Sequence, residues 1–151
     1  MEITVRKAAE SDAQALYILN REFNGAEGTS TAEGIARSLR ENPAETVLLA
    51  LADGVPAGFA CGQVHTSMCY PGAPGELTEL YVREAYRRRG IASRLLSALE
   101  AEFRGRSIPE LLLVTGTANE AARAFYESRG YYATSHVIYL KLLNPPKENA
   151  N

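Results

Sequence analysis

The chain has 151 residues, 46% hydrophobic and 23% charged, and its 16 Lys and Arg against 18 Asp and Glu give a net charge of −2. This size and mix are typical of one globular domain, and the acidic balance argues against a nucleic-acid-binding protein, which is usually basic. The longest apolar run, Val47–Ala52, is too short to span a membrane, and the charged N-terminus lacks the apolar core of a signal peptide. We therefore expect a soluble, cytoplasmic single domain over residues 1–143, followed by a flexible tail over 144–151.

The first part of the chain predicts a strand and two helices. Ile3–Arg6 is typical of a short opening strand. Ser11-x-x-Gln14 and Ser30-x-x-Glu33 have the spacing of capping boxes, in which two side chains bind the first free amides of a helix. We expect the first helix to end near Phe23 and the second near Glu41, just before a proline.

A hairpin and a crossover are predicted next. The apolar runs Thr46–Ala52 and Val55–His65 flank Asp53-Gly54, a strong signal for a tight antiparallel hairpin. After a Gly- and Pro-rich loop over 70–75 come a strand, a turn, an amphipathic helix and a buried strand, whose ranges are Glu76–Arg83, Arg87–Gly90, Ile91–Phe103 and Leu111–Val114. This succession predicts a parallel βαβ unit.

A last helix, about Asn119–Ser128, leads through Gly130 to a final strand pair around Tyr131–Leu142. The complete pattern indicates an α+β fold. Its central sheet is mixed and mostly antiparallel, with six to seven strands, about four flanking helices and one parallel crossover.

The segment Arg87–Ala92 is the strongest indication of chemistry. Five arginines and one acidic residue lie within Arg83–Arg94, in an otherwise mildly acidic chain. Between a strand and a helix, Gly90 and Ala92 leave the backbone accessible, and the first amides of the helix are unpaired. With the helix dipole these amides form an anion site suited to a phosphate. The alternative is a solvated turn whose arginines have no ligand.

Two motifs in order resemble the GNAT superfamily of acetyl-CoA-dependent N-acetyltransferases. The first is Arg87-x-x-Gly90-x-Ala92, after a strand that ends in Leu80-Tyr81-Val82. The second, about 30 residues on, is Asn119-x-x-Ala122-x-x-Phe125-Tyr126-x-x-x-Gly130-Tyr131. The resemblance is close over 76–131 and holds only in outline for the first helices and the hairpin.

The resemblance implies a binding site for acetyl-CoA as co-substrate. A bulge in the strand would splay it from its neighbour, and the pantetheine arm would pair with the opened edge. The backbone of Leu80, Tyr81 and Val82 would bind this arm, with Asn119 contacting it from the following helix and Tyr126 beside the sulfur. The pyrophosphate would be bound across Arg87, Arg88, Arg89, Gly90, Ile91, Ala92 and Ser93.

Acetyl transfer to an amine needs a base and benefits from an acid. An alkylammonium has a pKa of about 10.4, so a base must remove a proton near neutrality, and a phenol of pKa about 10 is protonated there. The resemblance implies that Tyr126 would protonate the leaving thiolate. Glu76, and after it Glu79, is the candidate base or amine ligand, although regular alternation would put the two on opposite faces. His65 and His136 are reserve candidates.

The sequence leaves the acceptor open. Glu76 and Glu79, with Glu22 and Glu27 if the first helices cover the acceptor site, favour a small cationic amine such as an amino sugar, an aminoglycoside or a polyamine. A peptide or Lys amine, a non-catalytic acyl-CoA sensor and nucleic-acid binding are weaker alternatives. Cys61 and Cys69 are read as free thiols, no metal-ligand motif is present, and relatives of the superfamily are often homodimers.

Overall fold

The computed structural model describes residues 1–144 and divides into two compact units, Met1–Val114 and Thr115–Asn151. The predicted tail 144–151 therefore lies, apart from Asn144, outside the described residues. The second unit contains one helix, α4 (Glu120–Glu127), in its described part. The first unit contains β1 (Ile3–Lys7), α1 (Ala13–Asn24), α2 (Ala32–Glu41), β2 (Glu45–Ala52), β3 (Val55–Val64), β4 (Gly75–Val82), α3 (Ile91–Gly105) and β5 (Leu111–Leu113).

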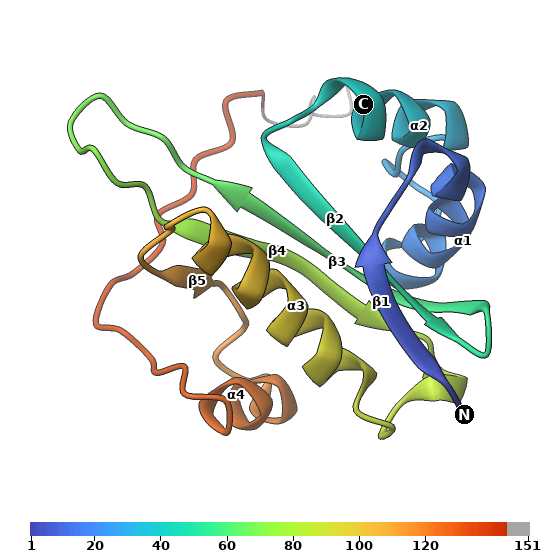
Figure 1. The fold of residues 1–151 in the computed structure, drawn as a ribbon. Coiled ribbons are helices and arrows are strands. Elements are labelled where there is room, and N and C mark those ends of the chain that lie inside the picture. Colours follow the sequence, from blue (N-terminus) through green and yellow to red (C-terminus); the bar gives the residue numbers. More distant parts are fainter. Residues whose placement is uncertain (145–151) are drawn as a thin grey trace, which may run out of the picture. The chain divides into compact units, whose positions relative to one another are not determined.

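The strands form one sheet in the order β1-β2-β3-β4-β5 (Figure 1). The first four pair antiparallel, and β4 pairs parallel with β5 after the crossover through α3. This confirms the mixed α+β architecture and the single parallel crossover. The sheet has five strands among the described residues, not the predicted six to seven.

The prediction of a strand pair around Tyr131–Leu142 was wrong. The described residues after α4 form no strand, and Val137, Ile138, Tyr139 and Leu140 are between 68% and 92% exposed. A preference for β structure reflects how a side chain fits a pleated, half-buried surface, so it does not by itself supply a partner strand. The apolar residues of this segment favour β structure, but up to residue 144 they form no ladder.

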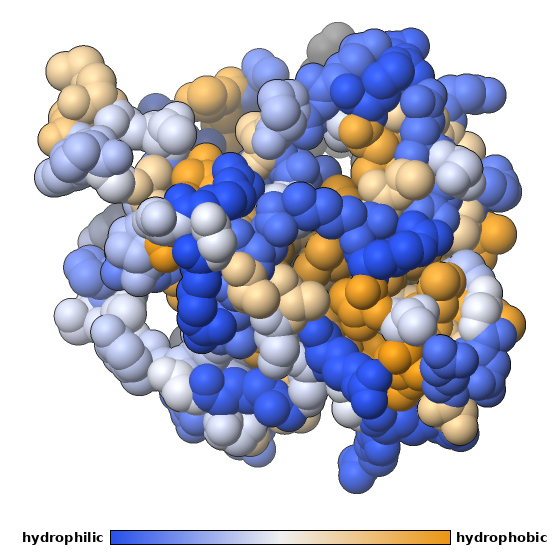
Figure 2. Space-filling model, in the orientation of Figure 1, coloured by the Kyte–Doolittle hydropathy of each residue, from blue (hydrophilic) through white to orange (hydrophobic). Residues whose placement is uncertain are grey.

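Helices cover both faces of the sheet in the first unit. Side chains alternate along β3, so Cys61 joins the apolar cluster that includes Leu16 and Leu19 of α1, while the Cα of Gly62 faces Leu99 and Phe103 of α3. Thus α3 lies on one face and α1 and α2 lie on the other (Figure 1). Hydrophobic side chains also reach the surface near β1 and α1, at the lower right of Figure 2.

Both predicted capping boxes are displaced. A 3-10 turn, Glu10–Asp12, precedes α1. The carboxylate of Asp12 accepts a hydrogen bond from the backbone amide of Ala9 at 2.7 Å, so Ser11 is not the capping residue. At α2 the cap is Thr31, whose hydroxyl accepts the amide of Gly34 at 3.0 Å. Thr31 has the extended backbone that an N-cap requires, and this shifts the helix start by one residue.

The predicted tight turn at Asp53-Gly54, between β2 and β3, is confirmed. Asp53 and Gly54 both have positive φ, as a tight hairpin requires. Farther along β3, a Cβ on Gly58 would lie 2.5 Å from the carbonyl oxygen of Tyr81 in β4.

We expect Gly58→Ala to lower the free energy of unfolding by roughly 3 kcal/mol, because two backbones must separate to admit the methyl group. Gly105→Ala is the matched control, since a Cβ there meets nothing within 4 Å. Urea titrations of both variants measure the effect, and equal midpoints would contradict it.

Candidate acetyl-transfer site

A bulge in β4 brings the two candidate carboxylates to one face of the sheet. Leu77 pairs with Gly62 and Glu79 pairs with Cys61, so Thr78 is one extra residue in β4. The Thr78 hydroxyl donates to the carbonyl of Cys61 at 3.2 Å. Glu76 pairs with Gln63, two positions from Cys61, so Glu76 and Glu79 share the face covered by α1 and α2. Regular alternation would have separated them.

The same position ends the pairing of β4 with β5. Residues Gly75–Leu77 of β4 pair with Leu111–Leu113, and β4 continues to Val82. In the described part of the first unit, no strand therefore pairs with the β5-side edge of β4 from Thr78 onward. The predicted cofactor residues Leu80, Tyr81 and Val82 lie on this stretch.

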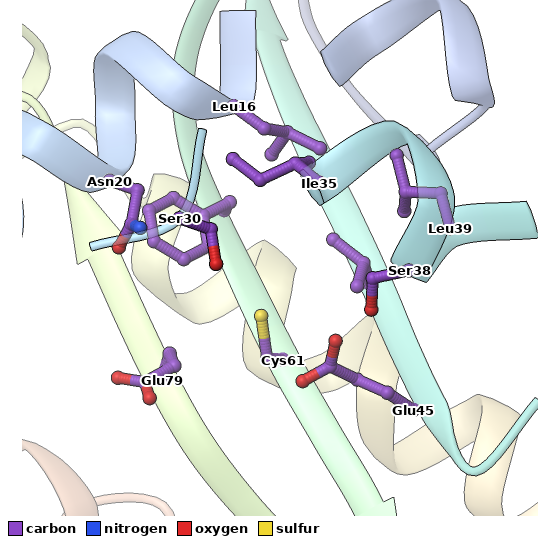
Figure 3. A pocket seen from close by; sticks show the side chains of 11 residues that line it. Leu16, Asn20, Ser30, Ile35, Ser38, Leu39, Glu45, Cys61 and Glu79 are labelled. Carbon is purple, nitrogen blue, oxygen red and sulfur yellow. The ribbon is translucent and has the colours of Figure 1, made fainter. Parts of the chain in front are cut away.

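A cavity of about 260 Å³ lies between the sheet and the two N-terminal helices. Glu79 of β4 lines it, together with Cys61 of β3 and Glu45, the first residue of β2; Figure 3 shows both carboxylates flanking the thiol. The remaining walls are neutral, formed by Leu16, Asn20, Ser30, Ile35, Ser38, Leu39, Val47 and Phe59. The N-terminal helices therefore cover a pocket that Glu79 lines, whereas Glu76 is not among its lining residues.

The pocket is electrostatically unfavourable for anions. Burial raises the pKa of Glu45 and of Glu79, and the negative charge of Glu45 raises that of Glu79 further. Burial and both carboxylates raise the pKa of the Cys61 thiol, which disfavours the thiolate form that a nucleophile needs. Sequence reasoning did not identify Glu45, because its place in the pocket depends on the pairing of three strands.

Glu76 and His65, both candidate bases, are bonded to each other. His65 Nε2 and Glu76 Oε2 lie 2.6 Å apart, where β3 ends and β4 begins. The His65 side chain is 49% exposed and that of Glu76 25%, so the pair lies at the surface. His65 thus enters the site as a partner of Glu76, while His136 belongs to the second unit.

Glu22 and Glu27, two acidic residues predicted to line the acceptor pocket, lie outside it. Glu22 accepts bonds from Nε and Nη2 of Arg83 at 2.9 and 2.6 Å, and from the Tyr81 hydroxyl at 3.2 Å. The hydrogen bonds from Arg83 lower the pKa of Glu22. This network joins α1 to the end of β4, where Tyr81 also stacks on Phe23 at 5.1 Å. Neither Glu22 nor Glu27 lines the pocket.

The arginines of the segment Arg83–Arg94 differ in their contacts. Arg83 pairs with Glu22, and Arg94 donates to the carbonyl of Ile3 at 2.8 Å. Arg87 donates from Nε to the Val82 carbonyl at 3.0 Å and lies over the Tyr81 ring at 6.0 Å. The remaining two arginines of the cluster, Arg88 and Arg89, are exposed like Arg87 and Arg94, and Arg89 donates from Nη1 to Met1 Sδ at 3.9 Å.

The start of α3 has the geometry of an anion site. Gly90 is its N-cap, with φ of 78°, and a Cβ there would meet nothing within 4 Å, so the backbone is accessible from solvent. The first intrahelical bond of α3 joins the amide of Arg94 to the carbonyl of Gly90 at 3.1 Å. The amides of Ile91 and Ala92 precede that bond, at the positive end of a 15-residue helix.

The second unit carries the other motif on α4. The Asn119 side chain caps this helix by accepting the amide of Ala122 at 3.2 Å. At the other end Gly130 has φ of 89°, and the amide of Tyr131 returns to the carbonyl of Tyr126 at 3.1 Å. Tyr126 packs edge-on against Phe125 and Tyr131, and burial raises the pKa of its phenol. Tyr126 is thus a protonated hydroxyl over the physiological pH range.

In residues 1–144, no group of three or more His, Cys, Asp or Glu is placed to hold a metal ion. None of the helices in that same range is long and apolar enough to cross a membrane.

Comparison with known proteins gives consistent matches. Residues 13–131 match the model of the acetyltransferase (GNAT) family. An acetyltransferase of Yersinia pestis (strain Pestoides F) is 31% identical over 109 residues, 72% of each chain. An aminoglycoside N(6')-acetyltransferase type 1 of Salmonella typhimurium is 25% identical over 96 residues, 62% of this chain and 66% of the relative. Among solved structures, AAC(6')-Iy in complex with the bisubstrate analogue CoA-S-monomethyl-acetylneamine has a TM-score of 0.83 at 18% identity, covering 94% of this chain and 99% of that one.

Proposed function

The chain belongs to the GNAT acetyltransferase family, and from this premise we propose that it transfers an acetyl group from acetyl-CoA directly to a primary amine of a small cationic molecule. Amino sugars, aminoglycosides and polyamine-like compounds form this class. The observation that carries the proposal is the bulge at Thr78. It turns Glu79 into a pocket without basic side chains and, at the same point, ends the pairing of β4 with β5.

The residues of the first unit fit acetyl-CoA. The edge of β4 along Leu80, Tyr81 and Val82 has backbone groups for an extended, amide-containing arm, as a further strand would bind. The amides at the start of α3 and the exposed Arg88 and Arg89 suit the pyrophosphate. When bound, acetyl-CoA supplies an activated thioester carbonyl.

Glu79 is the base in this proposal. It lines the pocket, and its raised pKa makes its carboxylate a stronger proton acceptor than an exposed glutamate. An ammonium group bound there is held by charge before it is deprotonated, so one residue both attracts and activates the amine. Glu76 lies on the same face outside the pocket, where its carboxylate is hydrogen-bonded to His65. Tyr126 and Asn119, of the second unit, are proposed to protonate the leaving thiolate and to contact the pantetheine arm.

An amine panel tests the proposal. The protein is incubated with acetyl-CoA and diamines, amino sugars, aminoglycosides, Lys-containing peptides and uncharged aromatic amines, and acetylated products are measured by mass. A thiol reagent is unsuitable, because Cys69 is an exposed free cysteine. We expect the small cationic amines to have the highest kcat/KM. Acetylation of peptides alone, or acetyl-CoA binding without turnover on any amine, would overturn the proposal.

A further inference from the structure

Glu45 and Glu79 line one cavity although they stand two strands apart. Glu45 pairs with Gln63 of β3, and Glu79 pairs with Cys61 two positions away. With strands about 4.8 Å apart and a rise of about 3.3 Å per residue, their Cα atoms are about 12 Å apart. In Figure 3 the Cys61 thiol lies between the two carboxylates, and all three groups line the cavity.

Among residues 1–144, no cationic side chain pairs with either carboxylate. Other acidic residues of the described part have such a partner: Glu10 pairs with Arg40, Glu22 with Arg83, and Glu102 with Lys7. The ion pairs of residues 1–144 include neither Glu45 nor Glu79, and the lining residues contain no Lys, Arg or His. Glu45 has a hydrogen bond from the Gln63 side chain, which is neutral. Two partly buried carboxylates therefore lack compensating charge.

The rest of the cavity limits what can supply that charge. Its volume of about 260 Å³ is at the small end for a ligand site. The apolar side chains of Leu16, Ile35 and Leu39 on the helical side suit methylene groups or a ring face. Within residues 1–144, no three His, Cys, Asp or Glu side chains are grouped to hold a metal ion, whereas an organic cation with two charged ends matches both the walls and the carboxylates.

We propose that Glu45 is a specificity-determining residue that binds a second ammonium group of the acceptor, while Glu79 binds the amine to be acetylated. The preferred acceptor is then a compact diamine, or one diamino ring of a larger molecule. This inference rests on the proposed function for the reaction, but the binding of a dication by the two carboxylates does not require turnover.

Paired amines of equal length test the inference. Diaminoalkanes of three to six carbons are compared with the monoamines of the same length, by acetylation kinetics and by calorimetric titration of the protein. We expect kcat/KM and affinity to be at least ten-fold higher for the best diamine than for its monoamine. Glu45→Gln, which keeps the shape and a polar contact for Gln63, should reduce this ratio at least five-fold. Glu33→Gln removes one exposed negative charge of α2 outside the pocket and should keep the ratio.

The outcomes separate the two proposals. Equal kcat/KM and affinity for diamine and monoamine in the wild-type protein would overturn the role of Glu45, even if both amines are acetylated. A ratio that Glu45→Gln leaves unchanged would overturn it as well. Diamine binding that depends on Glu45, without acetylation of any amine, would support the dication site and reject the proposed reaction. The wild-type comparison needs no variant, so a folding defect in Glu45→Gln does not leave the question open.

Discussion

Glu79→Gln is expected to lower kcat by about 100- to 1,000-fold, within the range for loss of a general base. The amide is nearly isosteric with the carboxylate but accepts no proton from an ammonium group at neutral pH. It also removes one of the two carboxylates that line the pocket, so the KM for the amine should rise. Steady-state kinetics with a diamine acceptor and saturating acetyl-CoA measure both parameters.

The pH dependence distinguishes a base from a binding residue. In the wild-type enzyme the base must be ionised, so kcat/KM falls as the pH drops through the pKa of Glu79, which burial and Glu45 raise above the ordinary value of 4.5. Above that pKa the profile should level off. In Glu79→Gln only the neutral fraction of the amine reacts, so kcat/KM should keep rising about ten-fold per pH unit toward the amine pKa of about 10.

Glu76→Gln is the matched control on the same strand and face. Its carboxylate is bonded to His65 and does not line the pocket, so we expect at most a ten-fold loss in kcat and an unchanged shape of the pH profile. A larger loss for Glu76→Gln than for Glu79→Gln would reverse the assignment. Equal profiles for the wild-type enzyme and Glu79→Gln would remove Glu79 from the proton transfer.

Sequence patterns predicted the elements whose causes are local. The Asp53-Gly54 turn, the amphipathic stripe of α3 and the glycine at its start each follow from residues close together in the chain, and all three are present. The helix caps were one or two residues out, because several Ser, Thr and Asp side chains near each start can cap. The choice among them depends on backbone geometry that neighbouring elements impose.

The site depends on non-local pairing, which the sequence does not encode in a readable pattern. The bulge at Thr78 arises where β3 and β4 change register, and without it Glu76 and Glu79 would occupy opposite faces. Glu45 reaches the pocket only through the pairing of β2 with β3. The wrong prediction of a strand pair after α4 has the same cause. That segment favours β structure, but its sequence does not show which strand it would pair with. The cofactor segment stays a prediction from the family motifs, which mark a strand edge and a helix start whose free groups are mostly backbone.

Tyr126→Phe is expected to lower kcat by about 100-fold, the low end of the effect of a general acid. The thiol that leaves has a pKa of about 8.5, well below that of a phenol, so a thiolate can depart without a proton at some cost in rate. Because burial raises the pKa of Tyr126, the acid form persists to high pH. Wild-type activity should therefore be lost only as the pH rises above about 10, and no such limb should remain in the variant.

Tyr131→Phe is the matched control, because it removes a hydroxyl from the ring that packs 5.8 Å from Tyr126. Both variants keep their aromatic contacts, so acetyl-CoA should raise the unfolding temperature of each as much as it does for the wild-type protein. We expect Tyr131→Phe to keep most of its kcat. If Tyr126→Phe also retained more than half of the wild-type kcat, proton donation by this hydroxyl would be excluded, and solvent would have to protonate the thiolate. Loss of acetyl-CoA binding in Tyr126→Phe would instead make its hydroxyl a binding group, because a proton donor acts after the thioester is already in place.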